Sequence, residues 1–283
     1  MTMSAQFTIA ILLPLLAVVA ATISCQPSPR THEGVDAKDD YGDAAVDSDV
    51  DKYDNNDNSF VILNGGGSKP KILALHGGGG NGADFSQQRG VRDLAAALPQ
   101  YEFVFANAPE AGGLWLRDPP SKAQPTTDPD WASNSVSYLD RVIAEHGPFY
   151  GLIAYSQGTP MALIYLAHAP ANTFQKVALF NGYAPTTHQG LLATIDHAAP
   201  FSTDTLVFSG ANDVFASASP GLAARFQSPV EIQSRTAGHH LPYASDGTFS
   251  RIVSFFQAEV ADGEPAPQTT KASTTAADSN EDP

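Results

Sequence analysis

Cysteine, basic residues and tryptophan are all scarce in this chain of 283 residues. Because Cys25 is the only cysteine, no disulfide can form within the chain. The 15 lysines and arginines are outnumbered by 30 acidic residues, and no basic cluster or tail suggests nucleic acid as a partner. The sequence has no internal repeat and no G-x-x-x-x-G-K-[ST] segment of the kind that binds nucleotide phosphates.

The excess of acidic residues lies at the two ends of the chain. Residues 26–59 carry 10 acids and 3 bases, and residues 261–283 carry 5 acids and 1 base. Neither segment has enough large apolar side chains to offset the entropy lost on ordering. We therefore expect a disordered acidic linker over 25–59, a folded domain over 60–260 and a disordered tail over 261–283.

The first 24 residues predict a targeting segment. FTIAILLPLLAVVAATIS, residues 7–24, has no charged side chain and suits either a signal peptide or a membrane anchor. Cys25 follows directly, and TISC resembles the bacterial lipobox, in which the cysteine is lipidated. We expect an exported protein that is either attached to a membrane through its N-terminus or secreted. The sequence leaves these alternatives open and does not indicate an oligomeric state.

The middle of the chain alternates between two patterns. Short apolar runs bounded by glycine and proline are typical of buried strands, and the segments between them have helical spacing. This alternation predicts an α/β fold, a mostly parallel sheet of about six strands with helices on both faces. The predicted strands are 71–76, 101–107, 150–156, 176–182, 205–210 and 230–235, and the predicted helices are 90–99, 135–147, 158–169, 220–226 and 247–260.

Two long stretches, 108–131 and 183–203, are predicted to be irregular. Each follows a predicted strand. Because ligands bind at the carboxyl ends of the strands in open α/β sheets, we expect both stretches to form walls of the ligand pocket.

A run of glycines, LHGGGGNG at 75–82, follows the first predicted strand. Gly77, Gly79 and Gly82 match the G-x-G-x-x-G loop of dinucleotide-binding proteins. An acyl-transfer enzyme uses a similar loop to point a backbone N–H at a developing oxyanion, and a loop without any role is the third interpretation. The dinucleotide interpretation also needs an acid at the end of the next strand, and that strand ends in Asn107.

The segment AYSQG, residues 154–158, has the pattern G-x-S-x-G of the nucleophile elbow, with Ala154 in place of the first glycine. In that sharp strand-to-helix turn, the residues two before and two after the serine must be small. Ser156 as a mere helix cap would not require small residues at both positions. The pattern therefore predicts Ser156 as a nucleophile.

An acid and then a histidine should follow the serine, each just beyond a later strand. Asp213 lies beyond 205–210, and His239 and His240 lie beyond the last predicted strand. We expect Asp213 and His239 to complete a triad with Ser156. The backbone N–H groups of Gly78 and Gln157 are the expected oxyanion hole.

At these positions the chain resembles the FSH family of small serine hydrolases. The resemblance rests on HGGGGNGADF, FVFANAPEAGG, GPFYGLIAYSQG, GANDVF and AGHHLP, and it covers about residues 70–258. It implies a lidless α/β-hydrolase fold with carboxylesterase or thioesterase activity. It also implies that His239, rather than His240, is the base, because the family pattern reads G-H-x-x-P. The family's tryptophan-rich stretch is reduced here to GLWLRDPP, which leaves substrate specificity open.

The predicted reaction is hydrolysis of a small-molecule ester or thioester through an acyl-enzyme. This chemistry requires no metal and no organic cofactor. Two alternatives remain open. One is a non-catalytic, surface-displayed binding module on a hydrolase fold, since fold does not fix function, and the other is a peptidase or lipase on the same fold.

Overall fold

The structure is a computed structural model that describes residues 60–65, 69–119 and 123–258. The segments predicted as the targeting region, the acidic linker and the acidic tail lie outside the described residues. Within the described ranges, no helix combines the length and the apolar character needed to cross a membrane.

The described part of the chain contains a seven-stranded sheet in the order β1-β3-β2-β4-β5-β6-β7. β1 runs antiparallel to β3, and the other neighbouring strands pair in parallel. The sheet confirms the predicted α/β fold. The strands are β1 Val61–Leu63, β2 Lys71–Leu75, β3 Glu102–Ala106, β4 Phe149–Tyr155, β5 Lys176–Phe180, β6 Asp204–Gly210 and β7 Val230–Ser234.

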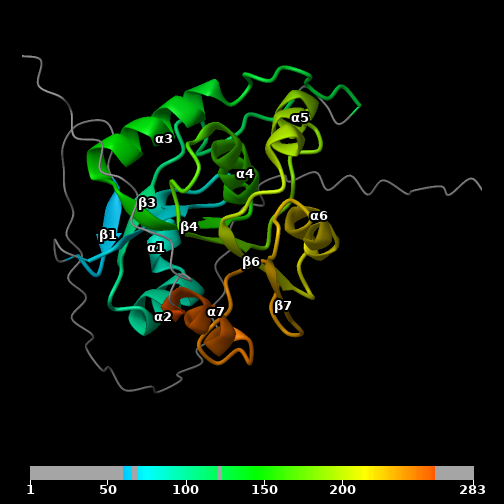
Figure 1. Cartoon of the computed structure of the whole chain (residues 1–283). Coiled ribbons are helices and arrows are strands. Elements are labelled where there is room, and N and C mark those ends of the chain that lie inside the picture. The colour runs from blue at the N-terminus through cyan, green and yellow to red at the C-terminus, as the bar shows by residue number, and fades with distance from the viewer. Residues whose placement is uncertain (1–59, 66–68, 120–122, 259–283) are drawn as a thin grey trace, which may run out of the picture. The chain divides into compact units, whose positions relative to one another are not determined.

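Helices cover both faces of the sheet, as expected (Figure 1). There are two apolar cores among the described residues. One contains side chains of helices α3, α4, α5 and α6, and the other contains side chains of α1, α2 and α7. The helices are α1 Gly82–Gln87, α2 Arg89–Ala97, α3 Ser133–His146, α4 Gly158–His168, α5 Gln189–Ala198, α6 Ser219–Ala223 and α7 Phe249–Gln257, and a 3-10 turn spans Ala216–Ala218.

The central strands contribute side chains to both cores, because successive side chains of a strand point to opposite faces of the sheet. In β2, Leu73 and Leu75 belong to one core, whereas Ile72 and Ala74 belong to the other. A strand buried on both faces must be apolar throughout. This is why β2 and β4 read as continuous apolar runs in the sequence.

Two α-helices and one strand were not predicted, nor was the 3-10 turn Ala216–Ala218. The stretch 183–203, expected to be irregular, contains α5, of which only Leu191 and Ile195 are buried. That single i, i+4 pair is too weak a pattern to stand out beside the prolines and threonines before it. The six-residue α1 and the three-residue β1 are too short to show a period.

Candidate active site

Ser156 lies in a strained turn between β4 and α4. Its φ of 51° falls in the left-handed region, which a residue with a side chain adopts only when the surrounding structure enforces it. Its backbone N–H donates to Phe180 O at 3.1 Å, which holds the turn against the end of β5. A Cβ at Gly158 would lie 2.6 Å from Leu75 O, so the position after the turn has no space for a side chain.

The structure brings Ser156, His239 and Asp213 into one chain of hydrogen bonds. His239 Nε2 lies 3.0 Å from Ser156 Oγ, and His239 Nδ1 lies 2.9 Å from Asp213 Oδ2. Because the ionised carboxylate can only accept, Nδ1 carries the proton and Nε2 accepts from the serine hydroxyl. The Asp213 side chain is fully buried and its second oxygen accepts from the Phe215 N–H at 2.7 Å, whereas the His239 side chain is 35% exposed.

The loop that carries His239 is fixed by side chains from the ends of β4 and β5. The Tyr155 hydroxyl donates to His239 O at 2.7 Å. Burial and, after it, the charge of Asp213 raise the pKa of Tyr155 to about 12, so the hydroxyl keeps its proton at neutral pH. The Asn181 amide donates to Gly238 O at 3.0 Å and to His240 O at 2.7 Å. Side chains next to the serine thus hold three successive carbonyls of this loop.

Asn181 also joins this loop to the strand before Asp213. Its side-chain oxygen accepts from the Gly210 N–H at 2.8 Å, and the residue is 1% exposed. Sequence reasoning missed Asn181. The available signal was an asparagine directly after an apolar strand, where the left-handed conformation, here φ 50°, favours asparagine.

Replacing this amide should destabilise the fold strongly. Asn181→Ala leaves a buried N–H and two carbonyls without their partner, so we expect a loss of about 3 kcal/mol in the free energy of unfolding. Asn172→Ala is the matched control, because Asn172 is exposed and also has a positive φ, 65°. Denaturant unfolding of both variants checks this. Equal losses would assign the effect to backbone conformation instead of the hydrogen bonds.

The glycine loop lies beside the serine turn. A Cβ at Gly77 would lie 3.2 Å from Ser156 Cβ, and a Cβ at Gly78 would lie 3.0 Å from Gln157 Cδ. Within the described residues, neither the Gly78 nor the Gln157 backbone N–H has a hydrogen-bond acceptor. The two predicted oxyanion donors therefore belong to segments that contact each other at the serine turn, and neither donates a hydrogen bond in the part of the chain that the structure describes.

The Gln157 side chain has a second role that the sequence did not reveal. Its Oε1 accepts from the Trp115 N–H at 2.8 Å, and its amide donates to Leu116 O at 3.1 Å. The Trp115 indole N–H donates to His76 O at 2.9 Å, and the Gly79 N–H donates to Gly113 O at 2.9 Å. The segment after β3 is thus fastened to both the glycine loop and the serine turn.

The two stretches expected to wall a pocket also contact each other. Thr126 N–H donates to Thr187 O at 3.1 Å, and Gln189 N–H donates to Thr126 O at 2.7 Å. Tyr183 packs on Phe215, with ring centroids 4.7 Å apart, and Phe215 lies 5.4 Å from His239. A row of aromatic side chains therefore extends from His239. That these stretches wall a ligand pocket stays a prediction.

His76, at the end of β2, supports the glycine loop in its neutral form. Its Nε2 accepts from the Ala108 N–H at 3.0 Å, so its Nδ1 carries the proton and donates to Gly77 O at 2.7 Å. Burial lowers the pKa of His76, and the hydrogen bond to Gly77 opposes that effect only in part. Protonation of Nε2 would make it face the Ala108 N–H as a second donor, so this hydrogen bond would be lost.

We expect this histidine to make the domain less stable in mild acid. As the pH falls below about 6.5, the unfolded chain protonates His76 before the folded chain does, so the free energy of unfolding falls by up to about 1.4 kcal/mol per pH unit. His76 contributes nothing more to this loss of stability once the pH is below its lowered pKa in the folded chain. When the free energy of unfolding is measured with denaturant at pH values between 7 and 5, its slope against pH should be shallower for His76→Asn than for the wild type. Asn172→Ala, which changes an exposed side chain that does not titrate, should keep the wild-type slope. Parallel slopes for all three proteins would contradict the assignment.

The His240 ring makes its contacts with neighbouring residues of its own loop. Its Nδ1 lies 2.8 Å from Leu241 O, its Nε2 accepts from the Gly238 N–H at 3.3 Å, and its ring stacks on Tyr243 at 4.5 Å. The structure therefore places His239, and not its neighbour, beside the serine. Among the described residues, no group of three or more histidine, cysteine, aspartate or glutamate side chains could hold a metal ion.

Comparison with known proteins finds esterases that are similar to this chain. The chain is 38% identical over 103 residues to Esterase alnB from Emericella nidulans, a match that covers 34% of this chain and 36% of that esterase. It is 26% identical over 197 residues to Esterase FUS5 from Gibberella moniliformis, which covers 64% of this chain and 83% of FUS5. The fold matches that of a carboxylesterase from Mesorhizobium loti, with a TM-score of 0.55, 15% identity and coverage of 74% of this chain and 99% of that one.

The family model described as serine hydrolase (FSH1) matches residues 66–248. This range includes the glycine loop, the serine turn and the loops that carry Asp213 and His239. More than half of the chain is therefore covered by one family pattern. The chain belongs to the FSH1 family of serine hydrolases.

Proposed function

We propose that this serine hydrolase is an esterase that cleaves small-molecule esters or thioesters through an acyl-enzyme on Ser156. The observation that carries the proposal is the unbroken chain of hydrogen bonds from Ser156 through His239 to Asp213, with distances of 3.0 and 2.9 Å. Nucleophile and base within hydrogen-bond reach, with the base oriented by a third group, is the arrangement that activates a serine hydroxyl.

In the first half of the reaction, His239 Nε2 takes the hydroxyl proton while Ser156 Oγ attacks the carbonyl carbon of the substrate. The negative charge moves to the carbonyl oxygen, where the backbone N–H groups of Gly78 and Gln157 stabilise it. The tetrahedral intermediate then collapses, the bond to the alcohol or thiol breaks, and the leaving group receives the proton from His239.

In the second half, His239 takes a proton from water, the hydroxide attacks the acyl carbon, and Ser156 leaves with the proton returned by His239. Asp213 keeps the imidazole in the required tautomer and stabilises its charged form. Burial of the Asp213 side chain strengthens that interaction, since little water screens it.

The substrate class is tested by comparing p-nitrophenyl butyrate, a matched butyryl thioester and a matched anilide. We expect turnover of the ester, and the ratio of kcat/KM between ester and thioester assigns the leaving group. Hydrolysis of the anilide at a comparable rate would instead favour a peptidase. No turnover of any of the three would favour a binding module that kept the fold.

We further propose that the protein acts outside the cytoplasm, anchored at a membrane through its N-terminus. The support is the uncharged segment 7–24, the adjacent Cys25 and the acidic segment that follows. Fractionation and mass spectrometry of the mature N-terminus test this. An unmodified terminus downstream of Cys25 in the medium would contradict anchoring, and a full-length chain in the cytosol would contradict export.

A further inference from the structure

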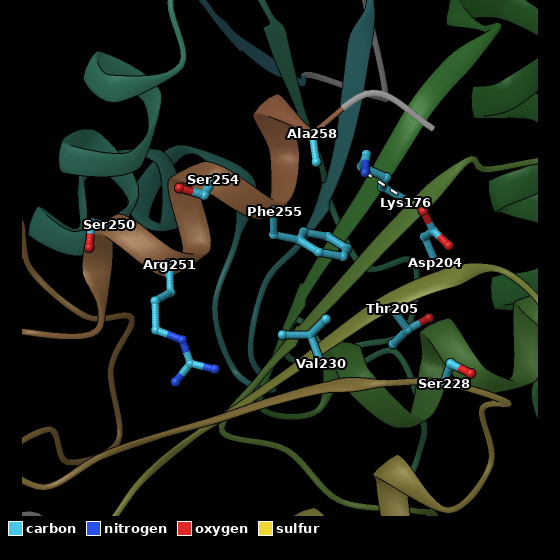
Figure 2. Close-up of a pocket in the computed structure, with 10 residues that line it drawn as sticks. All are labelled: Lys176, Asp204, Thr205, Ser228, Val230, Ser250, Arg251, Ser254, Phe255 and Ala258. Atoms are coloured by element: carbon cyan, nitrogen blue, oxygen red, sulfur yellow. Dashed lines mark ion pairs between the residues drawn. The ribbon is translucent and has the colours of Figure 1, made fainter. Parts of the chain in front are cut away.

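A cavity of about 490 Å³ opens at the sheet edge opposite Ser156. It lies where β5, β6 and β7 begin and against α7, and Figure 2 shows the residues that line it. Asp213 follows the far end of β6, whose seven residues span roughly 20 Å at about 3.3 Å per residue. The cavity is therefore separate from the site around Ser156.

At one end of the cavity, the charges of Lys176 and Asp204 cancel in an ion pair. The Lys176 side chain is 2% exposed and its Nζ lies 3.7 Å from Asp204 Oδ2. The same Nζ lies 4.9 Å from the centroid of the Phe255 ring. Burial lowers the pKa of Lys176, and the charge of Asp204 opposes that shift. The pair leaves little charge for a ligand at this end.

The other end carries an unmatched positive charge. Arg251, on α7, is exposed, and no ion pair among the described residues includes it. Figure 2 shows Arg251 on one side of the cavity and the Lys176–Asp204 pair on the other. With two cations and one carboxylate, the cavity has a net charge of +1.

The middle of the cavity is apolar. Figure 2 shows Val230 and Phe255 between the two charged ends. Val230 is 41% exposed, one of two large apolar side chains exposed among the described residues. An apolar surface of this kind, ending in a single free guanidinium, fits a ligand with an apolar body and one negative charge.

We propose that this cavity binds a small carboxylic acid, with its carboxylate on Arg251 and its apolar chain across Val230 and Phe255. A guanidinium can hold a carboxylate through two parallel hydrogen bonds. The volume falls within the range of about 300–1,000 Å³ that is usual for small-molecule sites. A phosphate ester, with nearly two negative charges, would exceed the charge that the cavity can balance. The proposal does not depend on the reaction at Ser156.

Calorimetric titration of the full chain with octanoate tests this site. Arg251→Gln and Val230→Glu should each weaken binding at least tenfold, the first by removing the cation and the second by adding an anion to the apolar surface. Arg235→Gln and Val214→Glu are the matched controls, because both residues are exposed and lie at the other edge of the sheet. Both controls should bind octanoate within twofold of the wild type, and octanol should bind at least tenfold more weakly than octanoate.

Three results would each overturn the proposal. Equal octanoate binding by the wild type and Arg251→Gln would show that the guanidinium holds no carboxylate. Equal binding of octanol and octanoate would show that the site does not recognise an anion. Weakened binding in Val214→Glu but not in Val230→Glu would place the acid beside Asp213 instead.

Discussion

Ser156→Ala should lower kcat for p-nitrophenyl butyrate on the order of a millionfold, as loss of a triad nucleophile does in serine hydrolases. The physical reason is that no acyl-enzyme can form without Oγ, while the glycine loop and the substrate contacts remain. The backbone strain at φ 51° is present with either side chain, so the fold should persist. Turnover by the wild type and the variant, with unfolding curves for both, measures the two effects separately.

Ser228→Ala is the control for this experiment, because Ser228 lines the cavity at the opposite edge of the sheet. Its kcat should stay within about twofold of the wild type. A Ser156→Ala protein that retains activity within tenfold of the wild type would show that another serine is the nucleophile.

His239→Asn should lower kcat by a similar factor, on the order of a millionfold, because a base and its serine act as one unit. Asparagine cannot accept the proton that His239 Nε2, 3.0 Å from Ser156 Oγ, is placed to take. His240→Asn should retain kcat within about tenfold, since both ring nitrogens of His240 are used in contacts with the backbone of its own loop.

The pair of variants separates the two adjacent histidines under one assay. If His240→Asn lost activity and His239→Asn kept it, the base would be His240, and the loop would have to rearrange during the reaction. Equal and moderate losses in both variants would instead indicate that the loop as a whole, and not one imidazole, matters.

The core of the fold could be predicted because its strands are buried on both faces. Such strands appear as continuous apolar runs, and β2 through β6 were found in this way. β7 was predicted as well, although three of its five residues are exposed. β1 has only three residues, and α5 buries only Leu191 and Ile195, so neither has a pattern that a sequence could display. Short or one-sided elements depend on tertiary contacts for their stability more than on local pattern.

The three side chains that the structure brings together at the candidate site could be located from the sequence, because each lies just beyond a strand that is easily recognised, and their catalytic roles stay a prediction. The groups that position them could not be located in this way. Asn181, Tyr155 and the Gln157 side chain act through backbone carbonyls and N–H groups of distant loops. Contacts of this kind depend on the three-dimensional path of the backbone, so the sequence shows no motif or regular spacing that would reveal them.

The most direct test of this account is to label the protein with a fluorophosphonate and to locate the adduct by mass spectrometry. The reagent reacts with a serine hydroxyl only where a base and oxyanion donors activate it. We predict one adduct, on Ser156, that is absent in Ser156→Ala and strongly slowed in His239→Asn. An adduct on another serine, or no adduct on a folded wild-type protein, would contradict the central claim that Ser156 is the activated nucleophile.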